Sequence, residues 1–511
     1  MRQFSDYFDE CFIDLKPDTA PLDTLFENDT EYLLIAGDFF GIQKFIFEQL
    51  STKNAAKVLR AKSAFIQIFT RYLAEFICHK LAIEEKYILS TNAGKFEILS
   101  PNTDSAALDE VQKKVDNYFI NKFYGLSGVS ICGVGCQKDD FDSSRKYRNL
   151  REKIINELER KKFNKLDLVS RNDFVMDYDS DINNENLCRI CNIRKGKNNC
   201  ELCNGFIKLS ELLVRKEKSK LHSSEMGISL DGFDSVVVID KKIKSYVLKE
   251  AKDVPASFET IAKNSCSHLD TGIKSLAVLK ADVDSMGKFM QDSDITDSFE
   301  NFDIFSKTLD NFFSLHVPKL MREKYKNSYT VFAGGDDLFL LGAWDEILGL
   351  ARQIQKDFQR FIKGKLSISF GIAIVKPSYP ISRLANYTQE LLEDAKAVDE
   401  EKNAITLFDE TVKWVSYLKV FGNLATTFEL LKDKENTAFL YRLLELVEMS
   451  KKVREGDVLA TIWKSKLRYS WSRNMGKEDP RILEVLDKNM QDYPSETKMF
   501  LSEYIYKRRQ G

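Results

Sequence analysis

Residues 329–342 read Tyr-Thr-Val-Phe-Ala-Gly-Gly-Asp-Asp-Leu-Phe-Leu-Leu-Gly, and this stretch decides the fold. Two apolar, β-prone segments flank Gly334-Gly335-Asp336-Asp337, which predicts a tight hairpin because such turn residues tolerate positive φ. Both carboxylates would lie at the hairpin tip, where adjacent like charges repel and are poorly solvated beside apolar strands. An ordinary acidic hairpin with a solvated tip is one explanation of the pair, and a bound divalent cation is the other.

A metal site at this hairpin requires a third acid on a neighbouring strand. Upstream, Ser275-Leu-Ala-Val-Leu-Lys-Ala-Asp-Val-Asp284 is an apolar strand pattern that ends in Asp282 and Asp284. Magnesium is held by one or two carboxylates plus substrate phosphates, and two such ions can stabilise both oxygens of an in-line phosphoryl transfer. The next segment, Ser285-Met-Gly-Lys-Phe289, is expected to cradle a triphosphate with backbone N–H groups at a helix start. Strand acid, helix and acidic hairpin together favour catalysis.

The first half of the chain repeats this arrangement without the acidic turn. The strand Glu31–Asp38 ends in an acid, and a Lys-Phe pair follows it at the spacing at which Lys288-Phe289 follows Asp282. Asn92-Ala-Gly-Lys95 takes the place of the Gly-Gly-Asp-Asp turn. We therefore predict an internal duplication of one α+β unit. Its first copy is expected to line a nucleotide pocket but to lack the metal pair.

Four cysteines form two Cys-x-x-Cys pairs, Cys188/Cys191 and Cys200/Cys203, joined by a polar loop. Four thiolates at this spacing can reach the tetrahedral geometry of zinc, and a site with four protein ligands is structural rather than catalytic. An accidental cluster is the alternative. The other cysteines are expected to be small core residues; they are Cys11, Cys78, Cys132, Cys136 and Cys266.

Three further regions leave their role open. The charged helical pattern from Phe141 to about Asp179 favours a solvated helix face over an RNA-phosphate contact. A helix is expected over Ile381–Val398, from which Lys396 could reach a triphosphate, although an isolated helix lysine is more often exposed. After Asp409 the pattern becomes helical, and basic and aromatic residues interleave, which fits contact with RNA or a partner subunit and equally fits helix packing. These residues are Trp463, Arg468, Tyr469, Trp471, Arg473 and Lys477.

Length and composition exclude several classes of protein. At 511 residues the chain is long enough for about three to four domains. The formal net charge of −2 gives no global attraction to nucleic acid, so any such contact must be local. The acidic start excludes a signal peptide and no apolar run suits a membrane span, so we expect a cytoplasmic protein without membrane contact. Four histidines occur and none precedes an aspartate, which leaves an HD-type nuclease site unsupported.

Taken in order, the motifs resemble those of the large, polymerase-like palm-domain subunit of type III CRISPR effector complexes, of the Csm kind. They are Gly37-Asp38 followed by Gly41-Ile42-Gln43-x-Phe45, the two Cys-x-x-Cys pairs, Ala281-Asp282-Val283-Asp284, Gly334-Gly335-Asp336-Asp337-Leu338, and Lys396. Many relatives begin with an HD nuclease domain that cuts single-stranded DNA. About 30 residues precede the first palm motif here, and we expect no such DNase.

The resemblance implies an α+β fold with two ferredoxin-like palm domains, a zinc-binding linker domain and a C-terminal helical domain. The expected order is a leader over 1–30, a degenerate first palm over 31–140, the helical and zinc-binding linker over 141–270, a catalytic second palm over 271–410 and the helical domain over 411–511. It also implies conversion of ATP into cyclic oligoadenylate messengers in antiviral defence, when the guide-RNA complex binds a target RNA. The implied partners are the guide RNA, the target RNA, and the backbone and small subunits of the effector.

The resemblance also implies roles for single residues. Asp282, Asp336 and Asp337 would be catalytic and hold Mg²⁺ or Mn²⁺, and Lys396 would offset developing charge. Nucleotide would be bound by backbone and side chains of a larger set. This set is Asp38, Gly41, Gly94, Ser285, Gly334, Gly335 and Lys396.

Two rival functions remain. A diguanylate-type cyclase of the GGDEF class shares the palm and metal logic, but it needs Glu-Phe where this chain has Asp337-Leu338, and it lacks the zinc module and the degenerate second palm. A non-catalytic RNA-binding scaffold has no need for the repulsive cluster of acids at 282, 336 and 337.

Overall fold

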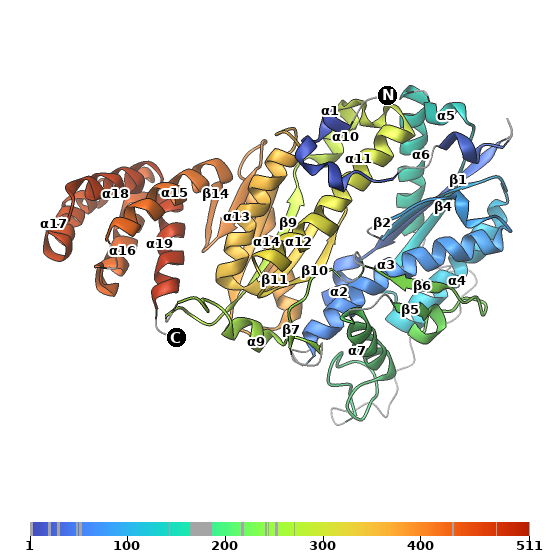
Figure 1. The fold of residues 1–511 in the computed structure, drawn as a ribbon, viewed down its shortest axis with the longest axis horizontal. Helices are drawn as coiled ribbons and strands as arrows, with labels where there is room; N and C mark the ends of the chain where they lie inside the picture. The colour runs from blue at the N-terminus through green and yellow to red at the C-terminus, as the bar shows by residue number, and fades with distance from the viewer. Residues whose placement is uncertain are drawn as a thin grey trace.

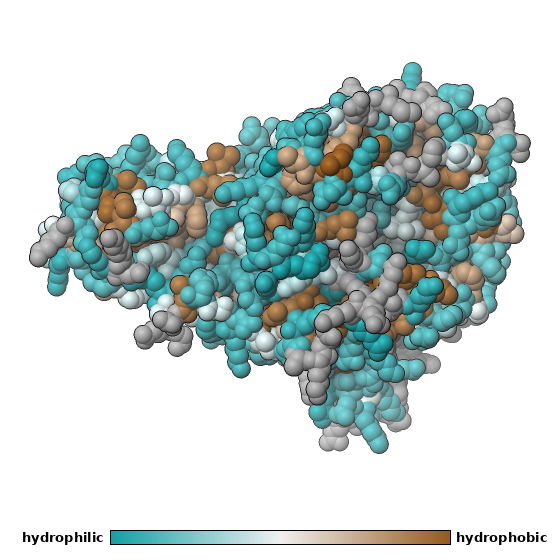
Figure 2. All heavy atoms as spheres, in the orientation of Figure 1, coloured by the Kyte–Doolittle hydropathy of each residue, from teal (hydrophilic) through white to brown (hydrophobic). Residues whose placement is uncertain are grey.

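The chain folds into two sheet units and a bundle of C-terminal helices, as the computed structural model in Figure 1 shows. The structure describes residues 4–18, 22–27, 31–47, 50, 54–92, 94–142, 144–163, 186–215, 219–240, 243, 245–250, 254–269, 271–431, 434–476 and 478–509. Among these residues, no helix is long and apolar enough to cross a membrane. The face drawn in Figure 2 is mostly hydrophilic, with apolar patches over both the sheet units and the C-terminal helices.

The first sheet unit has the chain order β-α-β-β-α-β. Its strands are β1 (Tyr32–Phe40), β2 (Ile88–Asn92), β3 (Lys95–Ser100) and β4 (Gly128–Cys136), and its helices are α2 (Ile42–Phe47), α3 (Ala55–Lys80) and α4 (Ser105–Phe123). The sheet is antiparallel in the order β2-β3-β1-β4. The apolar run of β1 is buried on both faces, and α3 is buried along most of its length.

The second sheet unit repeats this order and extends it. Its strands are β9 (Leu276–Val283), β10 (Ser328–Gly334), β11 (Asp337–Ala343), β12 (Ile368–Val375), β13 (Ala404–Leu407) and β14 (Glu410–Lys413). Its helices are α10 (Met286–Asp292), α11 (Phe299–Asn311), α12 (Val317–Glu323), α13 (Trp344–Phe361) and α14 (Ile381–Lys396). The sheet order β10-β11-β9-β12 matches β2-β3-β1-β4, and β13 and β14 continue the edge. The shared order is what the predicted duplication requires.

The N-terminal residues belong to the core of the second unit. This segment contains α1 (Phe4–Tyr7) and the 3₁₀ helix η1 (Glu10–Leu15). The Phe8 ring stacks on Phe361 with 4.7 Å between centroids, and the Asp9 N–H donates to the Phe361 carbonyl at 2.9 Å. This part of the expected leader over 1–30 is therefore packed in the second unit, because its apolar side chains are buried with those of α11 and α13.

The charged helix α6 (Ser144–Phe163), which follows α5 (Asp139–Asp142), covers the first sheet. Its Tyr147 and Ile154 are buried in one cluster with Tyr32 of β1. Arg151 on the same helix pairs with Glu97 of β3 and stacks on the Phe302 ring of α11 at 4.2 Å. The predicted solvated face is thus one side of an amphipathic helix, and the expected boundary near residue 141 falls inside the first unit. Residues 164–179 of that prediction lie outside the described part of the chain.

A small module connects the two sheet units. It contains the cysteine loops, α7 (Glu201–Leu213), the 3₁₀ turn η4 (Ser223–Met226), the hairpin β5 (Ser219–His222) with β6 (Val236–Ile239), the short pair β7 (Lys249–Glu250) with β8 (Val254–Pro255), and α9 (Phe258–Lys263). In Figure 1 α7 lies below α2 and α3 of the first unit. Phe206 of α7 packs with Phe45 and Phe65, so the module shares the core of the first unit.

The C-terminal helices form a separate core and return to the second unit. They are α15 (Trp414–Leu431), α16 (Thr437–Arg454), η8 (Val458–Ile462), α17 (Trp463–Met475), α18 (Pro480–Asp492) and α19 (Pro494–Arg508). The last helix is fixed by a buried ion pair. The two terminal nitrogens of the Arg352 guanidinium, Nη1 and Nη2, donate to the Glu503 carboxylate at 2.8 and 3.1 Å. The two side chains are 14% and 2% exposed.

We expect Glu503→Gln to destabilise the protein by about 3 to 5 kcal/mol, because it leaves a buried guanidinium without its counter-charge. Thermal unfolding at pH 7 measures this. The Arg352 and Lys507 charges outweigh burial and lower the pKa of Glu503 to about 2, so the stabilisation is present above the unfolded pKa and is lost as the pH falls towards 2.

The matched control is Glu445→Gln, which removes the exposed Arg442 pair. It is expected to change stability by less than about 0.5 kcal/mol. Equal effects of the two variants would contradict the prediction.

Candidate functional site

The acidic turn is the tip of the β10–β11 hairpin, as predicted. Gly334 pairs with Asp337, which leaves Gly335 and Asp336 as a two-residue turn. Gly335 has a φ of +65°, a conformation in which a β-carbon would be strained. Its N–H donates to Asp310 Oδ1 at 3.0 Å, so a buried side chain of α11 fixes the turn from outside the hairpin.

The three acids lie at the same end of the adjacent strands β9 and β11 in the second sheet. Asp337 of β11 lies directly opposite Asp282 of β9 in the antiparallel register. Residues opposite each other in such a pair project from the same face, so the two carboxylates are neighbours. The backbone carbonyl of Asp336 accepts from the Val283 N–H at 3.2 Å, which holds the exposed third acid beside them.

The electrostatics of Asp337 fit a cation ligand. Burial raises the pKa of its carboxyl, the buried Lys280 ammonium opposes that effect, and the Asp336 charge adds to it. Asp337 Oδ1 is buried without a hydrogen-bond partner. Carboxylate oxygens are the ligands that Mg²⁺ and Mn²⁺ prefer, so the unpartnered oxygen and its acidic neighbours suit a divalent cation.

Lys396 reaches this edge from the last turn of α14. Its ammonium forms an ion pair with the carboxylate of Asp282, and both side chains are about a quarter exposed, at 28% and 24%. Burial, helped by the nearby charges of Lys402 and Lys280, lowers the pKa of Lys396 to about 8. The helix lysine is therefore held in the acidic site rather than in solvent.

Asp282 and Asp284, which end the same predicted strand, have different surroundings in the structure. Asp284 is buried, and its Oδ2 accepts from the hydroxyls of Ser367 and Ser369 at 2.8 and 2.9 Å and from the Asn403 N–H at 3.1 Å. These bonds tie the end of β9 to β12. Ser285, the predicted start of the phosphate cradle, is exposed with a φ of +54° immediately before α10.

The first unit carries a reduced version of the same constellation. Asp38 lies opposite Lys95, which occupies the register position of Asp337. Gly94 therefore aligns with Asp336. Asp38 pairs at 2.7 Å with Lys162, from the end of α6.

This Asp38–Lys162 pair repeats the Asp282–Lys396 pair, because α6 follows β4 as α14 follows β12. Sequence reasoning missed Lys162. The signal that could have found it is a lysine near the end of the helix after the last strand of each copy.

The two glycines expected in the first nucleotide pocket have a packing role. Both have positive φ, +72° at Gly41 and +86° at Gly94. A β-carbon on Gly41 would lie 2.9 Å from the Leu126 carbonyl oxygen, and one on Gly94 would contact Phe39 and Ile42 at 3.2 Å. Positive φ at both positions, together with a close backbone contact at Gly41 and tight side-chain contacts at Gly94, accounts for the two glycines in the described structure.

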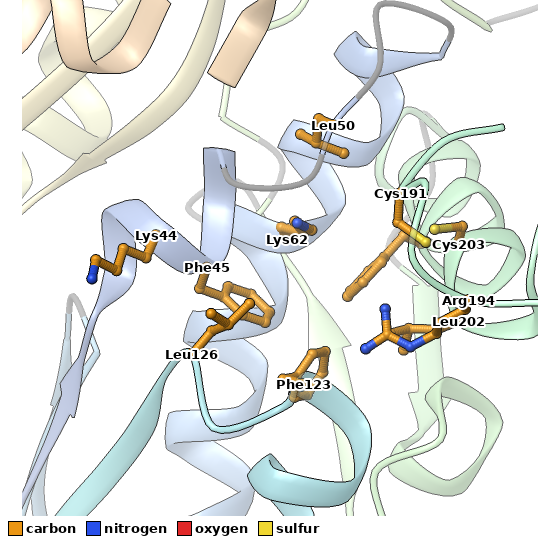
Figure 3. Close-up of a pocket in the computed structure, with 11 residues that line it drawn as sticks. Lys44, Phe45, Leu50, Lys62, Phe123, Leu126, Cys191, Arg194, Leu202 and Cys203 are labelled. Carbon is orange, nitrogen blue, oxygen red and sulfur yellow. The ribbon is translucent and has the colours of Figure 1, made fainter. Parts of the chain in front are cut away.

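The four cysteines form a second site. All are buried, and their sulfur atoms lie within 4.8 Å of one another; this is the one such group of potential metal ligands in the described ranges. The Cys191 and Cys200 sulfurs are 3.9 Å apart, close to the edge of about 3.8 Å that a tetrahedron of Zn–S bonds requires. Figure 3 shows Phe45 and Leu126 of the first unit on the opposite side of a small cavity from Cys191 and Cys203.

Comparison with known proteins shows which family this chain resembles. The model of the Cas10/Cmr2 second palm domain matches residues 275–406, and that of the Csm1 subunit domain B matches residues 31–179. Over these two segments the chain is similar to proteins of the Cas10/Csm1 family. The segment 275–406 contains Asp282, the acidic turn and Lys396, and the segment 31–179 contains Asp38 and Lys162.

Relatives of this family are named CRISPR system single-strand-specific deoxyribonuclease Cas10/Csm1 of subtype III-A. The protein of Methanocaldococcus jannaschii is 26% identical over 78% of this chain and 62% of its own length, and that of Enterococcus italicus is 26% identical over 88% and 65%. The chain thus spans less than two thirds of the length of these relatives. Among solved structures, a Csm1-Csm4 cassette in complex with cA3 matches with a TM-score of 0.70 and 20% identity, covering 96% of this chain and 71% of that one. A Csm1-Csm4 subcomplex matches with a TM-score of 0.71 and 21% identity, over 94% and 70%.

The purified chain is expected to carry about one zinc ion, and Cys200→Ser/Cys203→Ser to lose it, because two thiolates are too few to hold the ion. A structural zinc contributes roughly 10 kcal/mol or more to the fold of its module, so the loops of the variant should become sensitive to protease. Elemental analysis and limited proteolysis measure the two effects. Cys11→Ser, at an exposed cysteine, is the control. Zinc retained in the double variant would contradict the assignment.

Proposed function

We propose that this protein is the polymerase-like large subunit of a type III CRISPR effector and converts ATP into cyclic oligoadenylates when target RNA binds. The observation that carries the proposal is the edge at which Asp282 and Asp337 face each other beside Asp336 and Lys396. Apolar strands hold these acids in register although they repel, which favours a role in binding a cation and phosphates. Csm1-Csm4 structures with cA3, cA4 and one ATP agree with this class of ligand.

Both sheet units are proposed to be ferredoxin-like palms. The β-α-β-β-α-β order and the strand order β2-β3-β1-β4 support this, because they are those of that fold. The second palm, over residues 271–410, is the catalytic one. The first palm begins near residue 31 and includes α6, the zinc-bearing module follows it, and the helical domain begins near residue 411.

Each palm packs against the other next to its own site, which supports a reaction between two nucleotides. Phe47 of α2 lies against Phe339 of β11, with 4.5 Å between the ring centroids. In the reciprocal contact, Arg148 of α6 binds Asp297, in the segment between α10 and α11, at 2.8 Å. The loop after the first strand of each palm thus meets the other palm.

The proposed chemistry is attack of the 3′-hydroxyl of one ATP on the α-phosphorus of another, with pyrophosphate as the leaving group. Asp282, Asp336 and Asp337 would hold Mg²⁺ or Mn²⁺. The bound ions would supply Lewis-acid stabilisation of the charge that develops on the phosphoryl oxygens. Lys396, which neutralises Asp282 in the described structure, would add a positive charge beside the same oxygens.

Backbone groups around the sites would complete nucleotide binding. Gly334 and Gly335 would let the turn approach the donor nucleotide, and Ser285 would face its phosphates. Asp38, with Gly41 and Gly94 shaping the adjoining backbone, would line the acceptor pocket. Structural Zn²⁺ on the four cysteines would keep the connecting module folded against the first palm.

The effector assembly follows from the family and is part of the proposal. Guide RNA, target RNA, and backbone and small subunits are the proposed partners; a Csm4 chain is the partner in the solved relatives. The GGDEF-type cyclase is disfavoured by Asp337-Leu338 and by the second, degenerate copy in the same chain. A scaffold without activity is disfavoured by the unpartnered oxygen of Asp337.

We expect Asp336→Ala/Asp337→Ala to lower ATP turnover by at least about a hundredfold, because the metal would lose two of its three carboxylates. The assay incubates the chain, assembled with its guide-RNA complex, with labelled ATP or GTP and Mg²⁺ or Mn²⁺, with and without complementary RNA. Glu84→Ala/Glu85→Ala, at an adjacent pair of exposed acids, is the control and should keep full turnover.

ATP-specific cyclic products that require target RNA and vanish in the acidic-turn variant support the proposal. A cyclic dinucleotide formed from GTP without RNA would support the GGDEF alternative. No turnover under any of these conditions would support the alternative of a non-catalytic RNA-binding scaffold.

A second experiment separates the two strand acids. Asp282→Ala is expected to abolish turnover, because the site loses a metal ligand. It is expected to cost little stability, because the repulsion between neighbouring carboxylates is removed at the same time. Asp284→Ala is expected to destabilise the protein by about 3 kcal/mol, because one buried and two half-buried donors lose their acceptor, while the folded fraction keeps its turnover within a few-fold. Turnover per folded molecule and the unfolding midpoint are measured for both. An inactive but stable Asp284→Ala would move the metal ligand to that residue.

A further inference from the structure

The helix α17, at the end of the molecule farthest from the first palm in Figure 1, has an unusual charge pattern. Residues 458–477 contain five cations and no carboxylate, although the whole chain has a formal net charge of −2. Four of these cations lie in the described part of α17 and all are exposed. They are Lys464, Lys466, Arg468 and Arg473; Lys477 lies outside the described residues.

Packing accounts for only part of the aromatic residues among these cations. Trp463, Leu467, Trp471 and Met475 are buried and face α16 and α18, so the two tryptophans are core residues. Tyr469 differs, because its side chain is 68% exposed. Helix packing thus accounts for the two tryptophans but not for Tyr469, for which a surface contact stays a prediction.

The cations of this face have no carboxylate partner among the described residues. Lys464 contacts the side-chain oxygen of Gln491, Lys466 contacts the sulfur of Met449, and the described structure gives none of the four an ion pair with a carboxylate. Other exposed cations of the same domain are paired, such as Lys434 with Glu478 and Arg481 with Asp479. Like charges four residues apart on a helix repel, so Lys464 and Arg468 destabilise the free helix unless an anion binds them.

Helical geometry gathers these groups around the exposed ring. Lys466 and Arg473 are three residues before and four residues after Tyr469, which places all three on one face, and Arg468 adjoins it. A row of cations that flanks an exposed aromatic ring is the arrangement that binds single-stranded nucleic acid, in which the cations contact phosphates and the ring stacks on a base.

We propose that the exposed face of α17, formed by Lys464, Lys466, Arg468, Tyr469 and Arg473, binds the backbone and bases of single-stranded nucleic acid. The exposed Val458 and Leu459 precede the helix and carry no charge that would oppose this. This face lies in a different domain from the acidic edge, and its test does not depend on nucleotide turnover. Failure of one proposal therefore leaves the other standing.

The test is fluorescence anisotropy of the full chain with labelled single-stranded 20-nucleotide RNA and DNA of the same sequence, in 50–300 mM NaCl. Lys466→Gln/Arg468→Gln/Arg473→Gln is expected to weaken binding about tenfold or more at 100 mM NaCl. It should also make the slope of log K against log salt shallower by about two, since each phosphate contact contributes roughly −0.7 for single strands. Similar affinity for RNA and DNA would indicate phosphate and stacking contacts, and a loss confined to RNA would indicate contacts to the 2′-hydroxyl.

The matched control is Lys434→Gln/Arg442→Gln/Arg481→Gln, which removes the same charge from ion-paired positions of the domain. It should change binding less than twofold. Tyr469→Ala should weaken binding about tenfold and Tyr469→Phe should not, because stacking needs only the ring. Circular dichroism of each variant reports on folding.

Equal weakening by the two triple variants would overturn the proposal, because binding would then follow net charge. Unchanged binding in the α17 variant would overturn it as well and would leave this face to an acidic protein partner.

Discussion

The register between β9 and β11 is the constraint on which the acidic site depends. A slip by one residue would turn every side chain of a strand to the opposite face, which would separate Asp282 from Asp337 and exchange the side chains that pack into the cores on the two faces of the sheet. Leu279 and Leu340 are fully buried in this pair of strands, so the hydrophobic core enforces the register. Two carboxylates that repel are held together by burial of their apolar neighbours, which is the physical basis of the proposed affinity for a cation.

Duplication explains why the chain can carry a second site of opposite character. In both copies an aspartate ends the first strand and a lysine from the helix after the last strand pairs with it. In the first copy Lys95 replaces Asp337, so one carboxylate faces two ammonium groups. In the second copy Lys396 pairs with Asp282, and the charge of the buried Lys280 acts on Asp337. The same backbone therefore carries the acidic cluster of the proposed cation site in one unit and a lysine-neutralised aspartate at the matching position of the other.

Local sequence patterns predicted the elements whose chemistry is local. The hairpin, the cysteine knuckles and the order of strands follow from turn residues, ligand spacing and repeated strand patterns. Tertiary packing decided what the sequence left open. Phe8 packs in the core of the second unit although it is far from that unit in sequence, and Ile154 turns a charged helix into a cover of the first sheet. Asp284 differs from Asp282 only by its contacts with Ser367, Ser369 and Asn403, which no periodicity reveals.

The position of the acidic turn is set by residues outside its own hairpin. Asp310 of α11 accepts from the Gly335 N–H, and its neighbour Asn311 donates from its side chain to the carbonyl of Leu15 at 2.9 Å. Two adjacent residues of one helix thus link the N-terminal segment to the turn. Because Asp310 and Asn311 are both buried, a shift of α11 moves the turn with it. The hairpin supplies the acids, but their distance from the first palm depends on α11, which the N-terminal segment holds in place.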